Sequence, residues 1–243
     1  MTKLYTKLAR VYHEMYQGIF DYKKHFRFYN KILKDYNCQK ILEIGCGSGN
    51  LSPYFLKAGF NYKGLDISKE MLAIAKEVEP KGKFIQGDMR YLKLKEKFDA
   101  ILITGRSFTY MTTNDDVNKA LKSINSCLKQ NGILVFDNFD AEIIFGNFKR
   151  NIVQTSEYKG KEYKRISTNT PNLKTGWTWN WHTKYKIREN KKTKEFEDST
   201  VLRAFTKDEL KLFLKLNNFE PIKTTSKDGG ITTIAKKKPN QKK

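Results

Sequence analysis

The sequence has few cysteines and few histidines. Three of its 243 residues are cysteines, at positions 38, 46 and 127, and three are histidines. An odd number of cysteines without a Cys-x-x-Cys pair implies no disulfide framework and favours a reduced, cytoplasmic protein. The histidines have no clustered cysteine or carboxylate partners, so we expect no metal site.

Long apolar runs are also missing. No stretch approaches the ~18 apolar residues of a membrane span, and residues 1–16 lack the apolar core of a secretory signal. We therefore expect no membrane partner. Hydrophobic residues make up 39% of the chain and aromatic residues 13%, which is enough for a sizeable core and argues against disorder.

Acidic residues are scarce relative to basic ones, and the formal net charge is +21. Such a charge is typical of a nucleic-acid partner or an anionic substrate. The lysines are scattered along the whole chain, however, which favours a solvated basic surface. Only residues 236–243 form a charge run, and we expect 239–243 to be a disordered basic tail.

Apolar spacing predicts the secondary structure. In residues 4–36, apolar and aromatic side chains recur every three or four positions, which indicates two helices divided at Gly18. Strands are expected at 40–45, 62–67, 83–88, 98–104 and 133–139, and helices at 50–59, 68–78 (with Ser68 as N-cap) and 114–132 (ending at its glycine). Strands that alternate with helices predict an α/β fold with a parallel, doubly wound sheet.

The pattern changes after this region. Residues 149–205 alternate apolar and polar positions, which predicts an antiparallel meander. A helix opened by Thr206 and Glu209 follows, and then two strands around Gly229. Three tryptophans, at 177, 179 and 181, share one face of a strand. They either stack on a bound acceptor or pack on the main domain or a second subunit.

A glycine-rich stretch follows the first strand. Gly45, Gly47 and Gly49 lie at alternate positions between this strand and the next helix. Glycine lets the backbone approach a ligand closely, and a helix N-terminus offers free N–H groups to an anion. The spacing differs by one residue from the dinucleotide fingerprint, so a glycine turn without a ligand remains open.

Acidic residues sit at strand ends around this loop. Asp66 ends the second strand, 21 residues after Gly45, where a doubly wound fold places the carboxylate that binds ribose hydroxyls. Asp88 and Met89 follow the third strand and fit an adenine amine and ring. Glu43 lies inside an apolar strand, where a charge is costly. It is either a buried network partner or the partner of an amino-bearing ligand.

Five segments in this order resemble class I S-adenosylmethionine-dependent methyltransferases over residues 38–140. They are ILEIGCGSGNLS, GLDIS, GDMRYL, FDAILIT and LKQNGILVFDNF. The resemblance implies a Rossmann-like, seven-stranded sheet, S-adenosylmethionine as cofactor and S-adenosylhomocysteine as product. It places the loop under the methionine part, Asp66 at the ribose, Ile67 and Met89 around the adenine, Asp88 at its amine, and Thr104 beside the methionine part. The implied cofactor-binding set is Tyr22, Glu43, Gly45, Cys46, Gly47, Gly49, Asp66, Ile67, Met71, Asp88, Met89 and Thr104.

A longer set of segments is similar to the nucleotide-linked amino-sugar N,N-dimethyltransferases of the desosamine and mycaminose type. They are ARVYHEMYQGIFDYKKHF, LDISKEMLAIAK, RSFTYM and RAFTKDELKLFLKLNNF. The likeness implies a small-molecule amine acceptor. It implies helices in 1–36 that cap the cofactor, a core of 37–148 and 204–238, and an insertion, 149–203, that builds the substrate pocket and often a homodimer.

The same resemblance places Tyr12 and Tyr110 near the acceptor amine. The family has aspartate where His13 stands and histidine where Tyr110 stands, which leaves the exact substrate open. Methyl transfer depends mainly on positioning, and aromatic faces stabilise a sulfonium. The candidate catalytic residues are Tyr12, His13 and Tyr110, although a base is not required. For Tyr16, ordinary packing is the favoured role.

Other functions remain as alternatives. The basic surface and the tryptophan face fit an RNA methyltransferase, but the fourth strand ends in ITGRSF rather than in an Asn/Asp-Pro-Pro-Tyr type of motif. The glycine spacing counts against a dinucleotide-dependent oxidoreductase. A non-catalytic binder of S-adenosylmethionine stays open. Arg90 and Arg106 flank the predicted cleft, where each either meets an anionic acceptor or is simply solvated.

Overall fold

A seven-stranded sheet forms the centre of the protein, in a computed structural model that describes residues 2–190 and 192–239. The strand order is β10-β11-β5-β4-β1-β2-β3. The strands are β1 (Lys40–Ile44), β2 (Asn61–Asp66), β3 (Lys83–Gln86), β4 (Phe98–Ile103), β5 (Leu128–Phe139), β10 (Phe219–Lys227) and β11 (Gly230–Lys237). β1 to β5 pair in parallel, and β11 is antiparallel to both of its neighbours. The predicted α/β, doubly wound sheet is confirmed.

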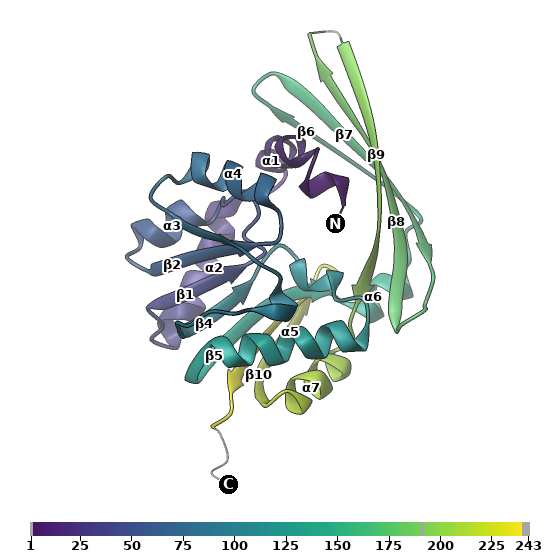
Figure 1. Ribbon diagram of the computed structural model, residues 1–243. Helices are drawn as coiled ribbons and strands as arrows, with labels where there is room; N and C mark the ends of the chain where they lie inside the picture. The colour runs from purple at the N-terminus through teal and green to yellow at the C-terminus, as the bar shows by residue number, and fades with distance from the viewer. Residues whose placement is uncertain (1, 191, 240–243) are drawn as a thin grey trace.

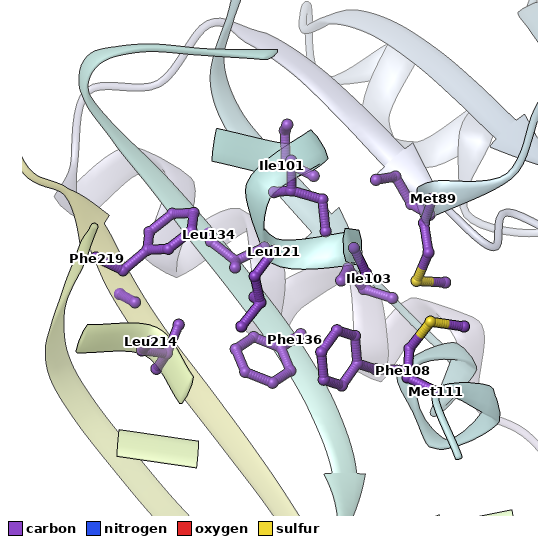
Figure 2. Close-up of a cluster of buried hydrophobic side chains, with 14 of the residues drawn as sticks. Met89, Ile101, Ile103, Phe108, Met111, Leu121, Leu134, Phe136, Leu214 and Phe219 are labelled. Atoms are coloured by element: carbon purple, nitrogen blue, oxygen red, sulfur yellow. The ribbon is translucent and has the colours of Figure 1, made fainter. Parts of the chain in front are cut away.

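Helices cover both faces of this sheet (Figure 1). They are α2 (Tyr22–Asp35), α3 (Ser52–Lys57), α4 (Lys69–Val78), α5 (Asn114–Cys127) and α7 (Lys207–Leu216). One buried cluster joins α5 and α7 to the sheet, and Figure 2 shows its side chains, among them Leu121, Phe136 and Leu214. A second cluster joins α2 and α3 to the opposite face. The sheet is therefore buried on both sides, as its nearly continuous apolar strands require.

Local signals set most helix boundaries as expected. The Ser68 side chain caps α4 by accepting a hydrogen bond from the Met71 N–H, and Thr206 and Glu209 form a complete capping box on α7. The first helix, α1 (Ala9–Gln17), ends just before Gly18. These polar caps satisfy N–H groups that the helix cannot pair itself.

One helix boundary was predicted wrongly. The helix expected to run to Gly132 ends at Cys127, and β5 begins at Leu128. The β4–β5 register shifts here, and Asn131 has a φ of 61°. A Cβ at Gly132 would lie 3.1 Å from the Asp99 carbonyl oxygen. This glycine therefore allows close approach of neighbouring backbone instead of ending a helix.

The predicted meander is confirmed as a second sheet with four antiparallel strands. They are β6 (Asn151–Tyr158), β7 (Lys161–Pro171), β8 (Trp177–Glu189) and β9 (Lys192–Ala204). A short helix, α6 (Ala141–Gly146), which was not predicted, leads into them. Trp179 is buried against Phe139 and Phe145, with ring centroids 5.3 and 6.1 Å away. For Trp179, packing on the main body is the observed role.

The N-terminal segment lies between the two sheets (Figure 1). It contains a short 3₁₀ helix, η1 (Lys3–Tyr5), and α1. Leu4, Leu8 and Met15 are buried in one cluster with Tyr163 and Tyr185 of the second sheet. The segment thereby ties the second sheet to the core. Of the predicted basic tail, residues 240–243 lie outside the described residues.

Candidate active site

A cavity of about 740 Å³ opens at the carboxyl ends of β1 to β4. This edge contains the point where the strand order reverses, because β1 has β2 on one side and β4 on the other. Ligands bind at such switch points in doubly wound folds. The wall residues used below are Tyr5, Tyr12, Gly45, Gly47, Asp66, Ile67, Met71, Asp88, Met89, Arg90, Gly105, Tyr110, His182, Ser199 and Thr200.

The glycine loop after β1 needs its glycines for conformation and for space. Gly45, Gly47 and Gly49 have φ values of 70°, 53° and 71°, which favour glycine. A Cβ at Gly45 would lie 2.1 Å from the Ser107 Oγ, and one at Gly49 would lie 2.9 Å from the Ala75 Cβ. The loop is therefore packed between the β4 loop and α4, with Gly45 and Gly47 exposed to the cavity.

Asp66 ends β2 and is fixed by backbone N–H groups. The Gly47 N–H donates to Oδ2 and the Ser68 N–H donates to Oδ1, both at 2.9 Å. The residue is only 9% exposed. Burial raises the pKa of Asp66, and these hydrogen bonds oppose that rise. The carboxylate is thus held in one orientation in the cavity wall, with lone pairs left for a ligand.

Glu43 is buried inside β1 and is already hydrogen-bonded. Tyr62 Oη donates to one carboxylate oxygen and Thr104 Oγ1 to the other, both at 2.6 Å. Burial raises the pKa of Glu43 to about 7. The first of the two expected roles, a buried network partner, is therefore present in the structure.

A second, smaller cavity of about 70 Å³ adjoins the first. The two share wall residues Tyr12, Gly45, Gly47 and Gly105. The smaller one is further lined by Tyr22, Glu43, Cys46 and Thr104, together with His25 and Asn50. A Cβ at Gly105 would meet nothing within 4 Å, and the φ of this residue is 62°. The predicted cofactor residues thus line two adjoining cavities, except Gly49, which lines neither.

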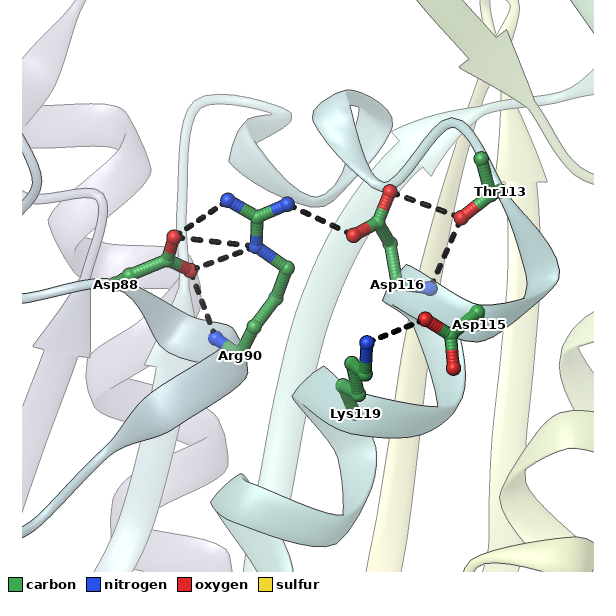
Figure 3. Close-up of polar contacts among 6 residues, drawn as sticks. All are labelled: Asp88, Arg90, Thr113, Asp115, Asp116 and Lys119. Atoms are coloured by element: carbon green, nitrogen blue, oxygen red, sulfur yellow. Dashed lines mark hydrogen bonds and ion pairs between the residues drawn. The ribbon is translucent and has the colours of Figure 1, made fainter.

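Asp88 follows β3 and pairs with Arg90 (Figure 3). Arg90 donates to both Asp88 oxygens and, through Nη1, to Asp116 in the first turn of α5 at 2.8 Å. Burial alone would raise the pKa of Asp88, but the hydrogen bonds from Arg90 hold it below its usual value. Arg90 lines the larger cavity and is bound there between two carboxylates.

Three tyrosine side chains line the larger cavity together with the glycine loop. Tyr12 stacks on Tyr16 with ring centroids 4.1 Å apart, and the ring edge of Tyr5 meets Tyr12 at 5.3 Å. Tyr5 and Tyr110 join through their hydroxyl groups at 2.8 Å. Tyr12 and Tyr110, both predicted near the acceptor, thus lie in one wall with Tyr5, which was not predicted.

His13 does not line either cavity. Its Nδ1 lies 2.9 Å from the Oγ of Ser48, a residue of the glycine loop that lines the smaller cavity, and burial lowers the pKa of His13. Arg106 lines neither cavity, and its guanidinium packs 4.2 Å from the Phe139 ring centroid. The structure therefore places both side chains outside the walls of the two cavities.

Strands β8 and β9 supply wall residues that the sequence did not indicate. His182, Ser199 and Thr200 face the larger cavity, and His182 Nδ1 lies 2.8 Å from the Ser199 Oγ. Nothing in the local pattern of the meander distinguishes these polar positions from solvated ones. Among the described residues there is no group of three or more potential metal ligands, and no helix is long and apolar enough to cross a membrane.

Comparison with solved structures gives the class of fold. A S-adenosylmethionine-dependent methyltransferase from Clostridium acetobutylicum is 22% identical, with a TM-score of 0.81 over 97% of this chain and 99% of that one. Streptomyces venezuelae DesVI is 21% identical, with a TM-score of 0.84 over 93% and 97%. CalS10, an amino pentose methyltransferase from Micromonospora echinaspora in its S-adenosylmethionine-bound form, is 20% identical, with a TM-score of 0.79 over 93% and 96%. The fold is that of S-adenosylmethionine-dependent methyltransferases.

Sequence comparison gives the family. A methyltransferase domain model matches residues 41–132. An uncharacterized methyltransferase of Bacillus cereus is 34% identical over 149 residues, which cover 59% of this chain and 68% of that protein. The putative methyltransferase YqeM of Bacillus subtilis is 37% identical over 102 residues, but these cover only 40% of this chain and 41% of that protein. The chain belongs to the methyltransferase family.

Proposed function

We propose that the protein transfers a methyl group from S-adenosylmethionine to the amine of a small molecule and releases S-adenosylhomocysteine. The observation that carries this proposal is the Asp66 carboxylate, oriented by the Gly47 and Ser68 N–H groups beside a left-handed glycine loop. A ribose diol offers two O–H donors, which one carboxylate can accept. The glycines let the rest of the ligand lie against the backbone.

The larger cavity fits the adenosine part. Ile67 and Met89 line it and would flank the adenine ring, with Met71 beneath the ribose side. Asp88 would accept from the adenine amine. Its two oxygens already make four contacts with Arg90, two of which share the single Nε–H. Three donor hydrogens thus occupy about four acceptor sites, and the adenine amine would take the site that the shared Nε–H gives up.

The smaller cavity fits the amino-acid part. Tyr22, Cys46 and Thr104 line it, and Gly49 supports the loop from behind. Glu43 lies at its base with a pKa of about 7. An ammonium group placed there would favour the ionised carboxylate, because a nearby positive charge lowers a carboxyl pKa. In this placement Glu43 would have both roles that the sequence left open, as a buried network partner and as the partner of an amino-bearing ligand.

The sulfonium of S-adenosylmethionine supplies a methyl group on an activated sulfur. The tyrosine wall then has to hold the acceptor nitrogen in line, so that its lone pair forms the new N–C bond as the S–C electron pair stays on sulfur. Burial raises the pKa of Tyr12 and Tyr110, so both remain neutral and orient the amine. The acceptor therefore arrives as a neutral amine, and the surplus proton leaves to solvent.

A nucleotide-linked amino sugar is the acceptor class we favour. One structural neighbour, CalS10, is an amino pentose methyltransferase. The side of the cavity formed by β8 and β9 is polar, with His182, Ser199 and Thr200 available to hydroxyl groups. The aromatic wall at Tyr12 and Tyr110 would face the amine, and the polar side would face the rest of the acceptor.

The test is transfer of labelled methyl from S-adenosylmethionine in three parallel reactions. The acceptors are nucleotide-linked amino sugars, a mixed pool of amine metabolites and total RNA. We expect label on the amino sugar or, for the broader proposal, on another small amine. Label on RNA alone would overturn the small-molecule proposal, and no transfer in any reaction would overturn the enzymatic one.

A further inference from the structure

Tyr5 reaches the cavity from the N-terminal segment. It ends η1 and lines the cavity together with Tyr12 and Tyr110. Its hydroxyl lies 2.8 Å from the Tyr110 hydroxyl, and the two rings meet edge to face with centroids 5.8 Å apart. Tyr5 and Tyr110 are therefore a hydrogen-bonded pair in the wall where we place the acceptor.

Both sheets determine where Tyr5 lies. The Lys3 and Leu4 N–H groups donate to the two Asp198 oxygens of β9, at 3.0 and 2.8 Å. The Tyr5 carbonyl accepts from the Ser68 hydroxyl, which also caps the helix after Asp66. The Tyr5 backbone is thus fixed to the second sheet on one side and to the cofactor region on the other.

The two hydroxyl hydrogens of the pair determine which hydrogen bonds it can make with a ligand. One of the two hydroxyl hydrogens lies between the oxygens, and the other is left over. Neither hydroxyl makes a further hydrogen bond to any described residue. Burial raises the pKa of both groups, so both stay neutral. The pair therefore presents lone pairs and one hydrogen, and it carries no charge.

We propose that Tyr5 is a positioning residue for the methyl acceptor and acts through the Tyr110 hydroxyl. Tyr5 fixes the rotation of that hydroxyl, and a Tyr110 lone pair accepts an N–H of the acceptor amine. The nitrogen lone pair is then free to face the methyl group. This inference rests on the proposed function, because it assigns a role in the same site.

A purely structural Tyr5 would behave differently. In that case Tyr5 would serve only to close the N-terminal segment over the cofactor. Loss of its hydroxyl would then weaken cofactor binding, and its effect would add to the effect of losing the Tyr110 hydroxyl. A positioning Tyr5 instead affects turnover through Tyr110, so the two effects cannot add.

The experiment is a double-mutant cycle with Tyr5→Phe, Tyr110→Phe and the double variant. The acceptor is the one on which the wild-type protein is active, and Tyr36→Phe, outside both cavities, is the matched control. We measure kcat, the KM for the acceptor and the Kd for S-adenosylhomocysteine. We expect Tyr5→Phe to lower kcat about 3- to 10-fold, the effect of one hydrogen bond, with the Kd changed less than about 2-fold. The double variant should be no slower than Tyr110→Phe.

Two results would overturn the inference while leaving the proposed function intact. One is an unchanged kcat in Tyr5→Phe. The other is a double variant whose loss equals the product of the two single losses. Failure of the proposed function looks different, because the wild-type protein itself would then transfer no methyl group, and the inference would fall with it.

Discussion

Asp66→Ala is the substitution that tests the cofactor site most directly. It removes the carboxylate that would accept two hydrogen bonds from the ribose diol. Hydrogen bonds to a charged group contribute about 1.5–3 kcal/mol each, so the loss is about 3–6 kcal/mol. That corresponds to a rise of about 10² to 10⁴ in Kd. Titration calorimetry with S-adenosylhomocysteine measures it.

The same substitution has a cost in stability that needs its own control. Asp66→Ala leaves the Gly47 and Ser68 N–H groups without their acceptor. Asp99 is a matched carboxylate near the start of β4, outside both cavities, and it accepts from the Gln39 and Lys40 N–H groups at 3.0 and 2.7 Å. Asp99→Ala should destabilise the fold by a similar amount, about 2 kcal/mol, with ligand affinity within about 2-fold of wild type. Unchanged affinity in Asp66→Ala, or an equal loss in Asp99→Ala, would refute our placement of the ribose.

Two further predictions concern the residues around this site. The pKa of Glu43 is about 7 in the fold and 4.5 ordinarily, so the folded state binds more protons between these values and its stability falls as pH rises from about 4.5 to 7. Glu43→Gln should lose this pH dependence. In chemical unfolding, its free energy of unfolding relative to that of the ligand-free wild type should rise by about 3 kcal/mol between pH 4.5 and 7. Parallel curves of unfolding free energy against pH would contradict this prediction. Arg90→Ala releases Asp88 and should weaken S-adenosylhomocysteine binding about 3- to 10-fold, by about 1 kcal/mol for a partly exposed pair. An unchanged affinity in calorimetry would show that Asp88 needs no partner.

The sequence alone predicted those parts of the site that local patterns determine. The position of Asp66 follows from the βα alternation, because a strand that ends there must place its last side chain at the carboxyl edge of the sheet. Capping residues such as Ser68 and Thr206 also act within one helical turn. The glycine loop could be recognised because its conformation restricts the residue type.

The remaining parts depend on contacts between distant segments. Tyr5 lies in a segment with no motif, and its role depends on Tyr110 and on the Asp198 carboxylate. His13 was a candidate catalytic residue, at the position where the similar family has aspartate beside Tyr12, but adjacent residues on a helix point about 100° apart. His13 consequently contacts Ser48, a wall residue of the smaller cavity, and lines neither cavity itself. The spacing of residues in the sequence does not indicate which face of α1 meets the cofactor region.

The Asp198 contact has a consequence for the order in which the protein folds. The Lys3 N–H finds its hydrogen-bond acceptor, Asp198, 195 residues further along the chain. Contacts of such separation form late, because the entropy of closing the long loop is lost before the contact stabilises anything. The wall around Tyr5 can therefore be completed only after β9 has been made and has paired with β8. The glycine loop and Asp66 precede β9 in the chain and are therefore synthesised before the strand that anchors the Tyr5 side of the cavity.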